Sequence, residues 1–144
     1  MLTSVRLAHT IGLVSISVFA ETKRLSANTI RKSPLASLVT CSPDSTYLVF
    51  AFSYSCPFCL NSIGNVNQYT EMHAVDRVIG LALDDTVAQA RFDRLFDINF
   101  EIRNFSQMKM THLSTKLPVT YIVRHDTIIS QYTGQVVSPA LLIP

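Results

Sequence analysis

Two apolar runs in the chain predict strands that are buried on both sides. Residues 47–52 are almost continuously apolar, and residues 77–83 form a second run of the same kind. Short runs rich in β-branched and aromatic residues are typical of strands in a sheet covered on both faces. We therefore expect a central sheet with layers of structure on either side.

A helical pattern follows each of these runs. After 47–52, apolar residues recur every third position from Leu60 to Tyr69, and Pro57 suits the first helical position because its missing N–H is not needed there. After 77–83, Asp84-Asp85 offer an N-cap for a second helix. The apolar stripe expected on that helix consists of Val87, Ala88, Phe92, Leu95 and Phe96. The pattern predicts the order strand, helix, strand, helix.

The second half of the chain predicts shorter elements. Residues 98–102 alternate between apolar and polar positions, which indicates a short strand, and 108–113 suggest a helical turn. Residues 119–123 and 127–132 form two further strand patterns, and the spacing at His125-Asp126 indicates a hairpin between them. Only 138–144 then remain, which is too short for a full closing helix.

The N-terminal segment has the pattern of an export signal. Arg6 precedes an apolar run at 11–20, and Val18-Phe19-Ala20 places small residues where signal peptidase requires them. The run is shorter than an ordinary membrane span, although a short uncleaved anchor remains an alternative. We expect a signal peptide or short membrane anchor at 1–20, a polar linker at 21–33 and one folded domain at 34–144.

Composition and charge narrow the functional classes. The chain has 144 residues, of which 48% are hydrophobic, and this fits one compact domain. Its formal charge is +2, but five of the twelve Lys and Arg residues fall in the first 32 positions. From Ser33 onward there are 7 basic and 9 acidic residues. No basic face is left that would favour a nucleic-acid partner.

Cys56-Pro57-Phe58-Cys59 stands where the strand pattern at 47–52 gives way to the helix. A cysteine at a helix N-terminus is placed near unpaired N–H groups that favour a thiolate, and a second cysteine one turn later can form a disulfide with it. A zinc site would need further ligands from Cys41, His73, His112 or His125, and no pair of these has ligand spacing. An inert or purely structural cysteine pair is the other alternative. We predict a redox pair, with no metal and no cofactor.

The order of these elements resembles the thioredoxin fold. The segment Ser53-Tyr54-Ser55-Cys56-Pro57-Phe58-Cys59 resembles the active-site signature of that superfamily, and the likeness extends over roughly 47–136. With the export signal, the chain is most similar to extracytoplasmic proteins of the TlpA-like and thiol-disulfide isomerase type, here with a CPFC active site. The resemblance implies an α/β thioredoxin-like fold, a mixed sheet flanked by helices, with a truncated C-terminal helix.

The resemblance also implies where a substrate would bind. Leu117-Pro118 matches the position at which the superfamily carries a cis-proline facing the cysteine pair. Leu117 would hold a substrate peptide through its backbone beside Cys56, in the manner of an added strand. The substrate-binding residues implied are Leu117, Pro118, Pro57 and Phe58, and the catalytic residues are Cys56 and Cys59. An ordinary trans proline at the start of an edge strand is the alternative.

One position departs from the superfamily pattern. Many relatives carry a buried Asp or Glu six residues before the first cysteine, where it accepts a proton from the second cysteine, and this chain has Phe50 there. Attack by Cys59 would then depend on water or be slow. Cys41 lies outside the pattern as well, and we expect it to be a small buried residue beside the first strand.

The expected function is thiol-disulfide exchange with exported proteins. Cys56 would attack a substrate disulfide as a thiolate, and Cys59 would resolve the mixed disulfide. Because Pro57 and Phe58 offer no cationic side chain beside the thiolate, a reductant or isomerase role is favoured over disulfide formation. The expected partners are exported proteins with disulfides or dithiols and an upstream thiol electron donor, outside the cytoplasm or at a membrane anchor. A thiol peroxidase of the AhpC/TSA type and a non-enzymatic binding module with a static disulfide are the alternatives.

Overall fold

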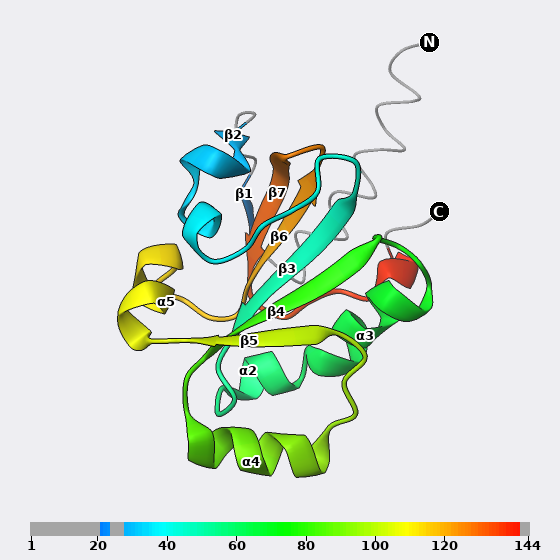
Figure 1. The fold of residues 1–144 in the computed structure, drawn as a ribbon. Helices are drawn as coiled ribbons and strands as arrows, with labels where there is room; N and C mark the ends of the chain where they lie inside the picture. The colour runs from blue at the N-terminus through cyan, green and yellow to red at the C-terminus, as the bar shows by residue number, and fades with distance from the viewer. Residues whose placement is uncertain (1–20, 24–27, 142–144) are drawn as a thin grey trace.

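The computed structural model describes residues 21–23 and 28–141, which fold into a mixed sheet with structure on both faces (Figure 1). The strands are β1 (Glu21–Lys23), β2 (Asn28–Thr29), β3 (Thr46–Phe52), β4 (Arg77–Leu83), β5 (Glu101–Phe105), β6 (Val119–Arg124) and β7 (Thr127–Thr133). The α-helices are α2 (Pro57–Leu60), α3 (Ile63–Glu71), α4 (Thr86–Leu95) and α5 (Gln107–Leu113). Short 3₁₀ turns are η1 (Ile30–Lys32), η2 (Pro34–Ser37) and η3 (Pro139–Leu141).

Five strands form the main sheet, in the order β7-β6-β3-β4-β5, and β1 and β2 both pair with β7. β3 and β4 are parallel, as are β4 and β5, whereas β6 is antiparallel to both β3 and β7. Parallel neighbours need a crossover connection, and the helical segments between β3, β4 and β5 provide it. The predicted α/β fold with a mixed central sheet is confirmed.

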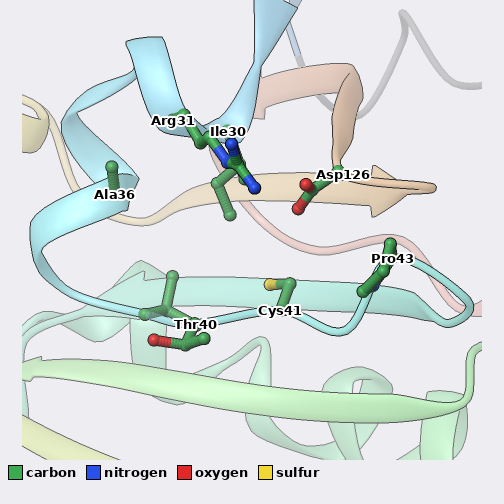
Figure 2. Close-up of a pocket in the computed structure, with 8 residues that line it drawn as sticks. Ile30, Arg31, Ala36, Thr40, Cys41, Pro43 and Asp126 are labelled. Carbon is green, nitrogen blue, oxygen red and sulfur yellow. The ribbon is translucent and has the colours of Figure 1, made fainter.

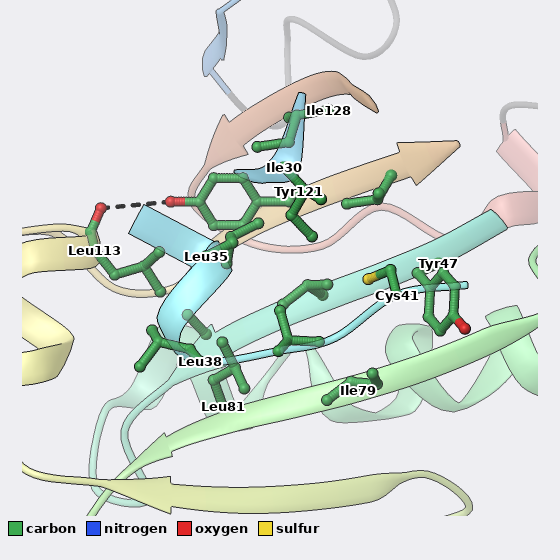
Figure 3. Close-up of a cluster of buried hydrophobic side chains, with 14 of the residues drawn as sticks. Ile30, Leu35, Leu38, Cys41, Tyr47, Ile79, Leu81, Leu113, Tyr121 and Ile128 are labelled. Carbon is green, nitrogen blue, oxygen red and sulfur yellow. Dashed lines mark hydrogen bonds between the residues drawn. The ribbon is translucent and has the colours of Figure 1, made fainter. Parts of the chain in front are cut away.

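The sheet separates two apolar layers. One face packs against η1, η2 and α5, and Figure 3 shows this cluster around Leu35, Tyr121 and Ile128. The other face packs against α2, α3 and α4, and it contains Cys59 among the buried side chains. Residues 47–52 are all buried, because β3 lies between neighbours within the sheet and between both layers. The prediction of a strand covered on both faces is confirmed.

The predicted helices are present with two differences. The helix expected from Pro57 is interrupted at Asn61 and Ser62, so α2 and α3 are separate elements. Asp85 caps α4 as expected, since its side chain accepts the Ala88 N–H at 3.0 Å. The apolar stripe predicted for α4 is wrong in part: Ala88 and Phe92 are buried, but Val87 and Leu95 are 72% and 69% exposed.

The described ends of the chain add to the sheet and its layers. The linker predicted for 21–33 includes β1, β2 and η1, and Ile30 is buried in the core. The expected signal or anchor at 1–20 lies outside the described residues. Within 21–23 and 28–141, no helix combines the length and the apolar character that a membrane crossing requires. After β7 the described chain forms only η3, so no closing helix is seen there.

We expect Gly80→Ala to lower the free energy of unfolding by about 1–3 kcal/mol, as is typical of an overpacked core. A Cβ at Gly80 would lie 3.0 Å from a ring carbon of Phe100 and 3.2 Å from one of Phe52, so buried rings would have to move. Gly64→Ala is the matched control, because a Cβ there meets nothing within 4 Å on α3. It should raise stability by about 0.5–1 kcal/mol. Urea denaturation of both variants checks the pair, and equal effects would contradict this packing.

Candidate active site

Cys56 lies at the N-terminal end of α2, directly after the loop that follows β3. Its backbone is extended and it is the N-cap residue, with Pro57 at the first helical position. The turn before it is held by Ser53: the Cys56 N–H donates to the Ser53 carbonyl at 3.3 Å, and the Ser55 N–H donates to Ser53 Oγ at 3.3 Å. Cys56 is partly exposed at this position.

Cys59 lies one turn later, and its side chain is in the core. It is fully buried among the residues beneath α2 and α3, and its Sγ accepts the Ser53 N–H at 3.5 Å. Burial raises the pKa of the Cys59 thiol well above its ordinary value, and the neighbouring Cys56 raises that pKa further. Cys59 therefore remains a protonated thiol at neutral pH, and it is buried whereas Cys56 is partly exposed.

The loop before β6 lies against Cys56. The Leu117-Pro118 peptide bond is cis, as expected. The Cys56 thiol donates a weak hydrogen bond to the Leu117 carbonyl at 3.8 Å, which places the predicted peptide-binding backbone beside the predicted nucleophile. Ser114 shapes the approach to this loop, because its Oγ donates to the Lys116 carbonyl at 2.7 Å. Pro118 is buried, and its carbonyl accepts the Gly134 N–H at 3.0 Å.

Pro57 and Phe58 are exposed beside the partly exposed Cys56. Phe58 is 61% exposed, which is unusual for a large aromatic side chain. Both side chains are available to contact a partner at the cysteine pair. The structure thus brings together Cys56, Cys59, Leu117 and Pro118, and it leaves Pro57 and Phe58 open on the surface of the same helix.

Phe50 occupies the interior where relatives are expected to carry an acid. It is fully buried, its ring stacks on Phe52 with centroids 4.9 Å apart, and it belongs to the same apolar cluster as Cys59. Thr120 is its register partner on β6 and is also fully buried. Among the described residues, the Thr120 hydroxyl has no hydrogen-bond partner. The apolar cluster around Cys59 is therefore rich in aromatic rings, and the Thr120 hydroxyl lies opposite Phe50 in the sheet.

Tyr54 is a site residue that the sequence analysis did not single out. It is buried two positions before Cys56, its ring packs edge-on against Phe92 with centroids 5.1 Å apart, and its hydroxyl donates to Asn104 Oδ1 at 2.6 Å. These contacts fix the cysteine loop to α4 and β5. A buried tyrosine is expected to find a hydrogen-bond partner, but the partner lies 50 residues away and no local pattern identifies it.

Cys41 is buried, as predicted, and it belongs to the apolar layer on the other side of the sheet from Cys59. It lines a pocket that Arg31 and Asp126 also line (Figure 2). The volume of this pocket is about 240 Å³. Burial, and then the Asp126 carboxylate, raise the pKa of the Cys41 thiol to about 11.

In the described part of the chain, no three His, Cys, Asp or Glu side chains come together as a group that could hold a metal ion.

We expect only Cys56 to react quickly when the reduced native protein meets iodoacetamide at pH 8. Cys41 and Cys59 are buried, and their raised pKa values leave little thiolate to react. Labelling of Cys41 should accelerate about tenfold for each pH unit between 8 and 10, because its thiolate fraction rises in that proportion below a pKa of about 11. Timed labelling followed by peptide mass spectrometry checks this order. Equal rates at the three cysteines would contradict the burial described above.

Comparison with known proteins finds similar structures but no similar sequence family. No family model matches the sequence, and no curated protein matches it. Among solved structures, StoA from Bacillus subtilis is 16% identical, with 67% of this chain and 79% of that chain covered and a TM-score of 0.57.

Two further solved structures agree. A secreted Mycobacterium tuberculosis disulfide oxidoreductase homologous to E. coli DsbE is 19% identical over 80% of this chain and 86% of its own, with a TM-score of 0.55. A thiol:disulfide interchange protein of the thioredoxin family from Chlorobium tepidum TLS is 16% identical over 86% and 91%, with a TM-score of 0.55. The likeness at these identities establishes the fold, and the chain has the thioredoxin fold found in thiol:disulfide interchange proteins.

Proposed function

We propose that this protein is a thiol-disulfide oxidoreductase that exchanges disulfides with exported proteins. The observation that carries the proposal is the asymmetry of the cysteine pair. Cys56 is partly exposed and lies against the Leu117 carbonyl, whereas Cys59 is buried one turn away. Solved structures with this fold include thiol:disulfide interchange proteins, which supports the same chemistry.

The exchange proceeds in two steps. The Cys56 thiolate attacks one sulfur of a substrate disulfide, forms a mixed disulfide and releases the other substrate sulfur as a thiolate. Cys59 then attacks the Cys56 sulfur, which releases the second substrate thiol and leaves a Cys56–Cys59 disulfide. The Cys59 proton passes to water or to a substrate sulfur. Two electrons have moved to the substrate, and an upstream dithiol donor must return the pair to its reduced form.

The substrate peptide is proposed to bind along the loop before β6. Leu117 offers its backbone beside Cys56, and Pro57 and Phe58 offer exposed apolar surface on α2. Without a cationic side chain between the cysteines, a reductant or isomerase role is favoured over that of a strong oxidant. The test is whether the purified protein accelerates the reduction of insulin by dithiothreitol, followed by turbidity. A rate equal to that of dithiothreitol alone would overturn the proposal.

We further propose that the protein acts outside the cytoplasm, on the basis of the signal pattern at 1–20 and the secreted protein among its structural neighbours. The mature chain is expected to begin near Glu21 if the signal is cleaved, and N-terminal sequencing of protein from an envelope fraction checks this. An intact Met1 in a soluble cytoplasmic fraction would contradict export.

A further inference from the structure

Ser62 is a fully buried polar residue at the interruption between α2 and α3. Its backbone N–H donates to the Cys59 carbonyl at 3.0 Å. Its hydroxyl donates to the Phe58 carbonyl at 2.9 Å and accepts the Val136 N–H at 2.9 Å. We call these last two hydrogen bonds the Ser62 link. Phe58 lies between the two cysteines, so the Ser62 link ends within the active-site turn.

The other end of the link is a segment that packs on α3. Residues 136–138, here called the C-terminal strap, lie between β7 and η3, and Figure 1 shows the chain passing from β7 to the red turn beside α3. The Asn65 side chain donates to the Val136 carbonyl at 2.8 Å, and the Tyr69 hydroxyl donates to the Val137 carbonyl at 3.0 Å. Ser138 Oγ also donates to the Gln68 side chain.

The side chains that bind the C-terminal strap differ in whether they also bind the cysteine turn. Asn65, Gln68 and Tyr69 hold the C-terminal strap to α3 and make no hydrogen bond to the cysteine turn. Ser62 alone among these four also binds Phe58. Val136 in addition packs in the same apolar cluster as Cys59. The Ser62 hydroxyl is thus the hydrogen-bonded connection between the cysteine turn and the strap, beside the apolar packing of Val136.

We propose that Ser62 is a positioning residue that couples the C-terminal strap to the redox equilibrium of the Cys56–Cys59 pair. The inference rests on the proposed function, because it needs a pair that is oxidised and reduced reversibly. On oxidation by one glutathione disulfide, the two thiols lose two protons and two electrons: the glutathione S–S bond breaks, the Cys56–Cys59 bond forms, and two reduced glutathione molecules are released. The disulfide would join the Cys56 and Cys59 sulfurs across the turn that contains the Phe58 carbonyl, and the proposal requires that this bond changes the position of that carbonyl.

The expected direction of the shift in the thiol-disulfide equilibrium depends on the redox state in which the Ser62 link is formed. All three cysteines are free thiols in this structure, and both hydrogen bonds of the Ser62 link are in place. The proposal takes the link to be stronger in this dithiol form than in the disulfide form, and the two measurements below test that difference. Coupling between two sites is reciprocal. If loss of the Ser62 link shifts the thiol-disulfide equilibrium toward the disulfide, then formation of the disulfide must weaken the Ser62 link by the same factor.

The first measurement is the equilibrium with glutathione buffers in the purified protein and in Ser62→Ala. The variant should shift toward the disulfide by at least about threefold, which is a potential more negative by about 14 mV. Asn65→Ala is the matched control, since it removes a strap contact and leaves the Phe58 carbonyl bonded; its constant should stay within about 1.5-fold of the parent. An unchanged constant in Ser62→Ala, or equal shifts in both variants, would overturn the inference.

The second measurement uses the parent protein, so it does not depend on the variant folding. Amide hydrogen exchange at Val136 should be at least about threefold faster in the oxidised form than in the reduced form, while the Met110 amide on the opposite layer should not change. Equal rates at Val136 in the two forms would overturn the inference although the pair is redox-active. A parent pair that never equilibrates with glutathione would instead overturn the proposed function on which the inference rests.

Discussion

Cys56→Ser is expected to abolish insulin reduction, and Cys59→Ser is expected to accumulate mixed disulfides with substrate. Cys56 is the partly exposed cysteine beside the Leu117 carbonyl, so its loss removes the sulfur that we propose as the nucleophile. Cys59 is buried, and its loss removes the sulfur that we propose to resolve the intermediate. Turbidity measures the insulin rate, and non-reducing gels with mass spectrometry detect the trapped species.

Cys41→Ser is the matched control for these variants. Cys41 lies in the apolar layer on the other face of the sheet from Cys59, so its substitution should leave the insulin rate unchanged. Parent-level activity in Cys56→Ser would refute the assignment of the nucleophile. A loss of activity in all three variants, with their folds intact, would equally contradict the separate roles described here.

Phe50→Glu should speed resolution of the mixed disulfide by about tenfold or more while lowering the free energy of unfolding by about 3–5 kcal/mol. General bases typically contribute 10²–10⁴-fold, and the position lies in the apolar cluster that contains Cys59. The stability loss comes from removing a fully buried, stacked ring and from burying a carboxyl whose pKa must rise. The unpaired Thr120 hydroxyl opposite this position can donate to the introduced carboxyl and offset part of that cost.

Phe50→Gln separates the proton acceptor from the packing change. Glutamine is as large as glutamate and is also polar, but it cannot accept the Cys59 proton. The Phe50→Gln variant should therefore have a lower free energy of unfolding than the parent, with no increase in the rate of resolution. The rates are measured in single-turnover resolution experiments between pH 6 and 9. If the parent already resolves as fast as Phe50→Glu over this range, the absent acid has no kinetic meaning, and water or substrate must accept the proton.

Much of the fold could be predicted because its signals are local. The strand at residues 47–52 and the strand β4 are continuous apolar runs, and the hairpin at His125-Asp126 has both residues at positive φ, as tight turns between strands require. The capping of α4 by Asp85 depends on Ala88, which is only three residues later. The cysteine pair was recognised because its two residues are close in sequence. The cis bond before Pro118 was expected from the resemblance to the thioredoxin superfamily, in which a proline follows the cysteine pair at a similar spacing along the chain.

The features that sequence missed depend on distant partners. Ser62 gains its role from Val136, 74 residues later, and Tyr54 from Asn104. The exposure of Val87 and Leu95 reflects the narrow contact of α4 with the sheet, which buries Ala88 and Phe92 only, whereas periodicity alone cannot set the width of a buried stripe. The short strands β1 and β2 form by pairing with β7, and their own residues carry little strand pattern.

The reduction potential of the Cys56–Cys59 pair tests the central claim most directly. The protein is equilibrated with defined thiol-disulfide buffers, and the fraction of each form is counted by thiol labelling of the two cysteines. We expect a reversible two-electron couple at a potential above about −300 mV, in the range of working pairs. A potential below about −300 mV, typical of a structural disulfide, would contradict it and would favour a static binding module with the same fold.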